Sequence, residues 1–175
     1  MASAGEKDNF PADAELYDAC AELVRKAAAR GVTVGTAESC TGGLVTGSLT
    51  AVPGSSAVVR GGVVSYAIPV KHEVLGVSSE VLDAPGVGAV SSECAAQMAE
   101  GARRVLGADV AVSVTGIAGP GGEEPGKPVG TVWMGLATAA GTRTQPFLFD
   151  GGRAEVRRAA VAAAVGLLRE GVMEA

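Results

Sequence analysis

The chain has 175 residues, of which 47% are hydrophobic and 19% are charged, and this size and composition predict one α/β domain with a substantial core. The formal net charge is −5, whereas proteins that bind nucleic acids usually carry an excess of basic residues. We therefore expect no nucleic-acid partner. Three widely separated cysteines, Cys20, Cys40 and Cys94, predict reduced thiols in a cytoplasmic protein rather than a disulfide framework.

The chain begins with a polar segment, residues 1–12, which lacks the apolar core of a signal peptide or membrane anchor. We expect this segment to form a flexible N-terminal tail and the domain to occupy residues 13–175. Apolar residues then recur at helical spacing over 13–30. A short β-branched run predicts a buried strand over 32–37, and the pattern predicts a helix over 44–51.

The middle of the chain continues this alternation. A strand is predicted over 58–66, in which Gly61 and Gly62 indicate a bulge or a close backbone contact. The fixed φ of Pro69 suits the first turn of a short helix that ends near Leu75. Further along the chain we expect a helix over 93–106 and a strand over 109–115 that is buried on both faces.

The C-terminal third begins with a loop over 116–130 that is rich in glycine and proline, and loops of this length are often functional. Strands over 131–138 and 143–149 are predicted to form a hairpin, and a helix is predicted over 154–173. The order of the elements predicts a single-domain, three-layer α/β/α sandwich with a mixed, largely parallel sheet.

The segment from Thr36 to Gly43 reads Thr-Ala-Glu-Ser-Cys-Thr-Gly-Gly and lies between a predicted strand and a predicted helix. Unpaired N–H groups at the start of a helix suit an anion or a developing oxyanion, so Ser39 is a candidate nucleophile. An ordinary helix cap explains the same residues, because serine and threonine are favoured at that position. Cys40 is a rival nucleophile, although buried structural thiols are common.

A serine becomes a nucleophile when a neighbouring group takes its proton, and the candidates here are Tyr66, Lys71, His72 and Glu38. Adjacent residues of a helix point about 100° apart, so Lys71 and His72 cannot both face Ser39 easily. Lys71 would need to be desolvated and neutral, whereas a solvated surface lysine is the ordinary alternative. The residues alone leave this choice open.

The glycine-rich segments give no sign of a cofactor. They match neither the Walker A pattern nor the dinucleotide pattern, so neither ATP nor NAD binding is indicated. With one histidine in the chain, we expect no required metal. Lys127 and Arg153 are candidates for neutralising a phosphate, and the alternative is that they only solvate the surface.

Four segments in this order and spacing resemble the CinA C-terminal domain family, which includes competence-damage proteins. They are residues 36–43, the spacing of Tyr66 and Lys71, the run Thr-Gly-Ile-Ala-Gly-Pro over 115–120, and the run Lys-Pro-Val-Gly-Thr-Val-Trp over 127–133. The resemblance covers roughly residues 13–170. Stand-alone members of the family, of the PncC type, are nicotinamide mononucleotide amidases.

The resemblance implies deamidation of nicotinamide mononucleotide in pyridine-nucleotide salvage, without a metal or cofactor, by a homo-oligomer. It implies that Ser39 is the nucleophile and that Lys71 and Tyr66 relay its proton, which favours Lys71 over His72. N–H groups near Thr41 to Gly43 would hold the oxyanion. The substrate-binding residues that it implies are Glu38, Thr41, Gly42, Gly43, Thr115, Gly116, Ala118, Gly119 and Arg153.

The sequence departs from the family at two places. Many relatives read Tyr-Ser-Asn-Glu-X-Lys where this chain has Ala67, Ile68 and Pro69 after the tyrosine, and many read Gly-Asp-Arg where this chain has Gly152 before Arg153. Two alternatives therefore stay open. One is a non-catalytic module that binds a nucleotide or a partner, and the other is an amidase for another small carboxamide.

Overall fold

A computed structural model describes residues 13–175, and the predicted tail over residues 1–12 lies outside the described residues. The elements in chain order are α1 (Ala14–Arg30), β1 (Val34–Glu38), α2 (Leu44–Thr50), the 3-10 turn η1 (Ser55–Ala57), β2 (Val59–Val64), α3 (Ile68–Glu73), α4 (Ser79–Leu82), α5 (Ser92–Leu106), β3 (Val110–Gly116), β4 (Thr131–Thr138), β5 (Gly141–Leu148) and α6 (Arg153–Glu174).

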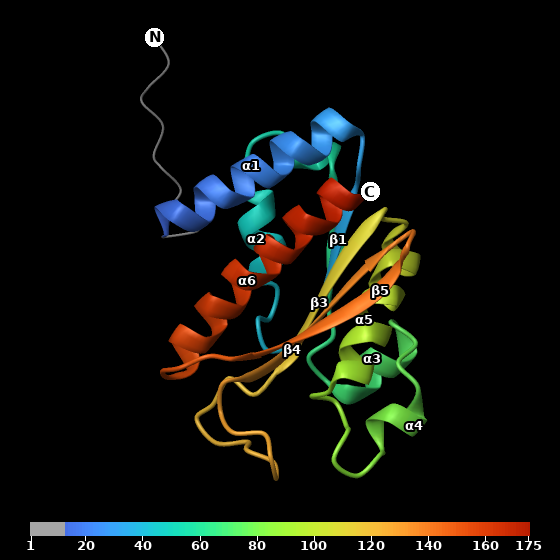
Figure 1. Ribbon diagram of the computed structural model, residues 1–175, viewed down its shortest axis with the longest axis vertical. Coiled ribbons are helices and arrows are strands. Elements are labelled where there is room, and N and C mark those ends of the chain that lie inside the picture. The colour runs from blue at the N-terminus through green and yellow to red at the C-terminus, as the bar shows by residue number, and fades with distance from the viewer. Residues whose placement is uncertain (1–12) are drawn as a thin grey trace.

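The five strands form one sheet in the order β2-β1-β3-β4-β5 (Figure 1). β1 pairs in parallel with both β2 and β3, whereas the pairs β3–β4 and β4–β5 are antiparallel. The prediction of a mixed sheet is confirmed, as is the hairpin of β4 and β5. Parallel strands bring their carboxyl ends to the same edge, so the residues after β1, β2 and β3 meet there.

Helices cover both faces of the sheet. α1, α2 and α6 pack against one another on one face, while α5 lies against β1, β3 and β4 on the other, with α3 and α4 beside it (Figure 1). The prediction of a three-layer α/β/α sandwich is therefore confirmed. Every residue of β1 is buried, and β3 is buried until Gly116, as expected for central strands covered on both faces.

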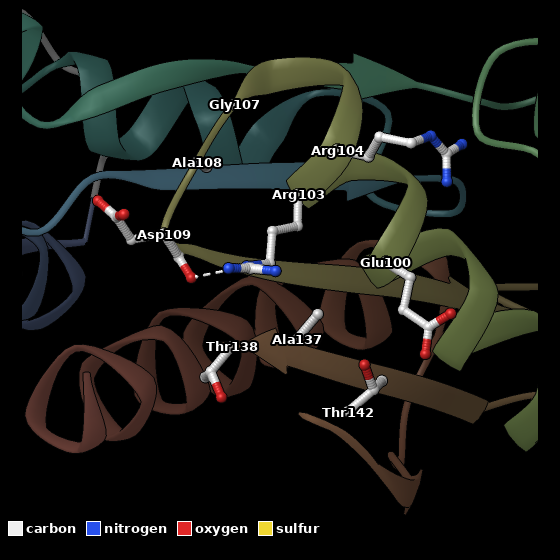
Figure 2. Close-up of a pocket in the computed structure, with 9 residues that line it drawn as sticks. All are labelled: Glu100, Arg103, Arg104, Gly107, Ala108, Asp109, Ala137, Thr138 and Thr142. Carbon is white, nitrogen blue, oxygen red and sulfur yellow. Dashed lines mark hydrogen bonds between the residues drawn. The ribbon is translucent and has the colours of Figure 1, made fainter. Parts of the chain in front are cut away.

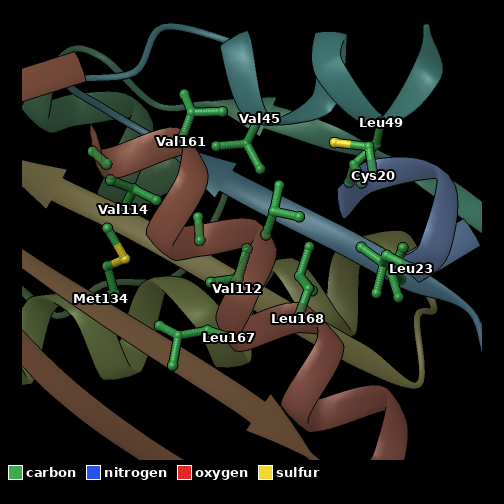
Figure 3. Packing of buried hydrophobic residues seen from close by; sticks show 14 of the residues in the cluster. Cys20, Leu23, Val45, Leu49, Val112, Val114, Met134, Val161, Leu167 and Leu168 are labelled. Atoms are coloured by element: carbon green, nitrogen blue, oxygen red, sulfur yellow. The ribbon is translucent and has the colours of Figure 1, made fainter. Parts of the chain in front are cut away.

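The core is built from small aliphatic side chains. Between the sheet and the layer of α1, α2 and α6, apolar residues of all these elements interlock, as Figure 3 shows for Leu23, Val45, Val112 and Leu168. A smaller cluster lies under α5 and includes Leu75, which follows α3. This second cluster fixes the position of α3 relative to the sheet, and α3 carries Lys71.

The observed helices and strands follow local signals in the sequence, except for two short segments. Asp13 and Ser91 cap α1 and α5 through their side chains. Gly61, with φ of 137°, and an irregular register between β1 and β2 confirm the predicted bulge. The sequence analysis did not anticipate the short helix α4 or the turn η1, because segments of three or four residues are too short to show a periodic pattern.

Candidate active site

Ser39 directly follows β1 at the carboxyl edge of the sheet. Its N–H donates to the carbonyl oxygen of Val114 in β3 at 2.9 Å, and the N–H of Ser65 donates to the carbonyl oxygen of Glu38 at 2.8 Å. These bonds extend the parallel pairing one step beyond each strand. They place Ser39 between the ends of β2 and β3, where polar residues from three strands converge.

Lys71 contacts Ser39 directly. Its Nζ lies 2.8 Å from Ser39 Oγ and also donates a hydrogen bond to the carbonyl oxygen of Ser65. The side chain is only 2% exposed. Burial lowers the pKa of Lys71 because it disfavours the charged ammonium, although the neighbouring thiols of Cys94 and Cys40 act in the opposite direction. Burial thus shifts this amine toward the neutral form that a base beside the serine hydroxyl requires.

The structure favours neither of the alternatives to this pair, His72 and Cys40. His72 is exposed, and its Nδ1 lies 2.8 Å from the carbonyl oxygen of Val77. Cys40 is 5% exposed, and burial raises the pKa of its thiol to about 11, which keeps it protonated at neutral pH. The structure thus brings Lys71, and not His72, to Ser39.

Glu38 is fully buried beneath the turn that follows Ser39. Its Oε2 accepts the N–H groups of Gly43 and Val45, and its Oε1 accepts the N–H of Thr46 and the hydroxyls of Thr46 and Thr36. The carboxylate therefore caps α2, where negative charge is favourable. Glu38 was expected to bind substrate, but in this structure it holds the turn.

Two N–H groups of the turn that follows Ser39 already donate hydrogen bonds within the protein. That of Gly42 donates to the carbonyl oxygen of Ser39 at 3.0 Å, and that of Gly43 donates to Glu38. Of the three N–H groups from Thr41 to Gly43 that were expected to hold an oxyanion, that of Thr41 has no acceptor within residues 13–175, but Thr41 is fully buried. The Thr41 hydroxyl is also buried and without a partner there.

Tyr66 and Arg153 lie together at the outer side of the site. One terminal nitrogen of Arg153 donates to the Tyr66 hydroxyl at 3.2 Å, and the other donates to the carbonyl oxygen of Gly119 at 2.9 Å. Tyr66 is 60% exposed. Its hydroxyl thus contacts Arg153, and within the described part of the chain it forms no hydrogen bond with Ser39 or Lys71. A proton relay through Tyr66 is not present in this arrangement.

The residues at and after the end of β3 that were expected to bind substrate are buried or half-buried. Thr115 is buried, and its hydroxyl donates to the carbonyl oxygen of Ala89 at 2.6 Å. Gly116 pairs with Val132 of β4, and Ala118 is buried in the core. Of this group, Gly119 is the residue that the structure links to Arg153.

Lys127 is not free to bind a phosphate in this structure. Its Nζ donates to the carbonyl oxygen of Val87 at 2.6 Å and to the carboxylate of Glu124 at 2.9 Å. These bonds tie the loop between β3 and β4 to the loop before α5. Lys127 therefore has a structural role here, and Arg153 is the better candidate for contacting an anion.

Arg157 is a residue that the sequence analysis did not single out. Its Nε donates to the carbonyl oxygen of Cys40 and its Nη2 to that of Thr41, both at 3.1 Å. Arg157 lies four residues after Arg153 and therefore on the same face of α6. This spacing was a signal in the sequence that could have identified it.

A separate pocket of about 400 Å³ lies at the opposite end of the sheet, beside Asp109, which precedes β3 (Figure 2). Arg103 there donates its Nε–H to the carbonyl oxygen of Asp109, and Arg104 donates to that of Leu75. Glu100 and Asp109 balance the two positive charges, so the pocket offers no net charge to an ion. It is distant from Ser39 along β1 and β3.

Two further observations concern residues 13–175. Within this range no three His, Cys, Asp or Glu side chains come together as a group that could hold a metal ion. None of the helices formed by these residues has both the length and the apolar character needed to cross a membrane.

The fold and the site together define the class of this protein. It is a three-layer α/β domain in which a serine contacts a buried lysine at the carboxyl edge of the sheet. The chain belongs to the CinA family, since the model of the CinA C-terminal domain matches residues 17–172. It is 52% identical over 147 residues to a CinA-like protein of Anaeromyxobacter dehalogenans, a match that covers 84% of this chain and 36% of that protein. A CinA-like protein of Gemmatimonas aurantiaca is 45% identical over 152 residues, which cover 87% of this chain and 35% of that protein. The chain thus spans about a third of the length of the curated relatives it matches.

Solved structures agree with this assignment. The competence/damage inducible protein CihA of Agrobacterium tumefaciens is similar with a TM-score of 0.85 and 42% identity, over 89% of this chain and 94% of that one. A CinA superfamily protein of Klebsiella pneumoniae has a TM-score of 0.86 and 35% identity, over 91% and 99% of the two chains.

Proposed function

We propose that this chain is an amidase that hydrolyses the carboxamide of nicotinamide mononucleotide to nicotinic acid mononucleotide and ammonia. The observation that carries the proposal is the distance of 2.8 Å between Lys71 Nζ and Ser39 Oγ, in a site where Lys71 is 2% exposed. Amide hydrolysis needs a base to activate the nucleophile and an acid to protonate the leaving nitrogen, and one buried amine supplies both. The resemblance to PncC-type amidases supports the choice of substrate.

In the proposed reaction, Ser39 Oγ forms a bond to the carbonyl carbon while neutral Lys71 takes the hydroxyl proton. The carbon–nitrogen bond then breaks, and the same proton moves from Lys71 to the departing nitrogen, which leaves as ammonia. A water molecule next attacks the acyl ester and gives a proton to Lys71, which returns it to Ser39 Oγ as the acid is released. The Ser65 carbonyl holds one N–H of Lys71 and so helps to orient the amine toward Ser39.

We propose that Arg153 and Tyr66 contact the nucleotide part of the substrate. Arg153 carries the positive charge that a phosphate requires, and both side chains lie at the accessible side of the site. Substrate would then compete with Gly119 and Tyr66 for the guanidinium. We also propose that the protein is a homo-oligomer and acts in pyridine-nucleotide salvage. The three cysteines are free thiols, which supports a cytoplasmic location.

The experiment incubates the protein with nicotinamide mononucleotide in the presence of a chelator, and measures both ammonia and nicotinic acid mononucleotide. We expect equal amounts of the two products from the wild type, none from Ser39→Ala, and about 10²–10⁴-fold slower release from Lys71→Met. His72→Ala serves as the matched control and should keep most of the activity. A wild type that releases neither product, under conditions in which a known amidase does, refutes the proposed function.

The second candidate function is a non-catalytic module that binds a pyridine nucleotide. The placement of Tyr66 favours it, because the tyrosine hydroxyl is bonded to Arg153 and not to the serine–lysine pair. Calorimetric binding of nicotinamide mononucleotide without any product would support this reading. If other small carboxamides are hydrolysed while this nucleotide is not, the chain is an amidase of different specificity.

A further inference from the structure

The segment from Leu75 to Val77, which follows α3, holds the short helix that carries Lys71. The N–H of Val77 donates to the carbonyl oxygen of Lys71 at 3.0 Å, so the chain folds back onto the lysine. Leu75 is 1% exposed and Val77 is fully buried, and both lie in the cluster under α5. The placement of Lys71 beside Ser39 therefore depends on how this segment lies on α5.

Gly101 of α5 allows the backbone of Leu75 to approach the helix. Gly101 is buried, and a Cβ built on it would lie 2.0 Å from the Leu75 carbonyl oxygen, 2.8 Å from the carbonyl carbon and 2.9 Å from the Cα. No rotation of a side chain can relieve an overlap with backbone atoms. A side chain at this position would therefore displace the segment by about 1 Å or more, because non-bonded heavy atoms pack at about 3.5 Å.

Arg104 binds the same carbonyl group. Its Nη2 donates to the Leu75 carbonyl oxygen at 2.9 Å, and it lies three residues after Gly101, on the same face of α5. The neighbouring Arg103 points in another direction and donates to the carbonyl oxygen of Asp109 (Figure 2). The Leu75 carbonyl thus lies against a glycine and accepts a hydrogen bond from an arginine of the same helix.

We infer that Gly101 and Arg104 are positioning residues that dock the segment after α3 against α5 and so hold the Lys71 amine at Ser39. This role rests on the proposed function, which takes Lys71 as the base. Neither residue touches the reacting atoms, because both act through the backbone of Leu75, four residues after Lys71. A displacement of about 1 Å at a catalytic group can slow a reaction by about 10²-fold.

Displacement of the segment should also change the surroundings of the Lys71 amine. The titratable groups that face the amine are the thiols of Cys94 on α5 and Cys40 after β1, and both thiols are buried. Burial lowers the pKa of Lys71, so water admitted between α3 and α5 should raise this pKa toward the ordinary 10.5. A loss of stability alone would leave the pKa unchanged in the folded enzyme.

The first test compares Gly101→Ala with Gly171→Ala, because both glycines are buried inside helices. A Cβ at Gly171 would lie 2.6 Å from Cγ1 of Val110, so the control also overpacks the core, but it lies about 27 Å along α6 from Arg153. For Gly101→Ala we expect kcat to fall about 10²-fold, with KM within about threefold of the wild type and a higher apparent pKa in kcat/KM. Gly171→Ala should keep kcat and the pKa.

The second test removes the hydrogen bond from Arg104. Arg104→Met keeps the aliphatic stem but loses the donor, and we expect kcat to fall about tenfold, as for the loss of one hydrogen bond from a charged group. Arg104→Lys retains one charged donor for the Leu75 carbonyl and should keep kcat within about threefold of the wild type. Arg103→Met is the matched control and should equal the wild type.

A further readout does not depend on the substrate. Ser39 Oγ attacks the phosphorus of an alkyl fluorophosphonate, a P–O bond forms as the P–F bond breaks, fluoride leaves, and the serine proton passes to Lys71. The rate of mass increase at Ser39 should fall at least about tenfold in Gly101→Ala and not in Gly171→Ala. If the wild type hydrolyses no nucleotide but labelling shows this pattern, the proposed function fails and the positioning role stands.

The opposite results overturn the positioning role. It is refuted if Gly101→Ala keeps kcat and the labelling rate within about threefold of Gly171→Ala, or if its rates fall while its pH profile stays that of the wild type. If Gly101→Ala does not fold, as judged by thermal unfolding, Arg104→Met decides, and rates equal to those of Arg103→Met refute the role. Nucleotide hydrolysis by the wild type together with either refuting result leaves the proposed function intact.

Discussion

Replacement of Glu38 by glutamine tests whether this carboxylate holds the nucleophile turn. The two side chains have nearly the same shape, but an amide has one oxygen where the carboxylate has two. Oε2 of Glu38 accepts two backbone N–H groups, and Oε1 accepts one backbone N–H and two hydroxyls. The hydroxyls can rotate and accept from an amide NH₂ group, whereas backbone N–H groups cannot.

The expected loss of stability follows from the orientation in which the glutamine side chain keeps the most hydrogen bonds. With the NH₂ group in place of Oε1, the N–H of Thr46 loses its acceptor, which costs about 1–3 kcal/mol in a buried site. The bonds from Gly43 and Val45 remain but lose the assistance of the negative charge, at about 1 kcal/mol each. We therefore expect Glu38→Gln to lower the free energy of unfolding by about 3–5 kcal/mol, a large part of the ~5–15 kcal/mol of a typical domain.

The measurement is equilibrium unfolding in urea, followed by far-UV circular dichroism. The midpoint should fall with an unchanged slope, since the area exposed on unfolding is the same. Glu73→Gln is the matched control, because Glu73 is exposed and should change stability by no more than about 0.5 kcal/mol. A loss below about 1 kcal/mol in Glu38→Gln would show that the turn does not depend on the carboxylate.

Three further outcomes are expected. Lys71→Met should reduce turnover by about 10²–10⁴-fold without loss of stability at pH 7, because it removes the base and also the cost of moving a polar amine from water into a buried site, while His72→Gln should keep its activity. The kcat/KM of the wild type should rise with pH through an apparent pKa below 10.5. The unfolded chain binds the Lys71 proton more tightly, so the unfolding free energy should also rise between that pKa and 10.5, and this part of the slope should be absent in Lys71→Met. Gly130→Ala should destabilise the fold by at least about 2 kcal/mol, since a Cβ there would lie 2.0 Å from the Phe149 carbonyl oxygen, whereas Gly126→Ala, also at positive φ but in open space, should cost only about 1 kcal/mol.

Each of these expectations has a contrary result. Wild-type turnover in Lys71→Met would remove the lysine from the reaction, and a kcat/KM that does not change with pH below 10.5 would mean that the amine does not titrate in catalysis. Equal urea midpoints for Gly130→Ala and Gly126→Ala would show that the backbone at Phe149 can shift to accommodate a Cβ at residue 130 without loss of stability.

Local pattern in the sequence determined the elements and their layers. The apolar periodicity of 13–30 and 154–173, the capping residues Asp13 and Ser91, and the continuous apolar run of β3 are set by neighbours within a few positions, and the structure follows them. The sequence also presented Ser39 as a candidate nucleophile, because small hydroxyl residues between a strand and a helix form a recognisable pattern. It presented Lys71 as one of several candidate bases. It contained no local signal for segments as short as α4.

The contacts between these residues were decided only by tertiary packing. Which of Lys71 and His72 faces Ser39 depends on how α3 lies on the Leu75 cluster, a contact between distant segments that periodicity does not encode. Glu38 caps α2 and Arg157 binds the Cys40 and Thr41 carbonyls because buried polar groups must find partners, and the partners available depend on the whole fold. The sequence supplied the chemical groups, and the burial that lowers the pKa of Lys71 exists only once the layers have closed around it.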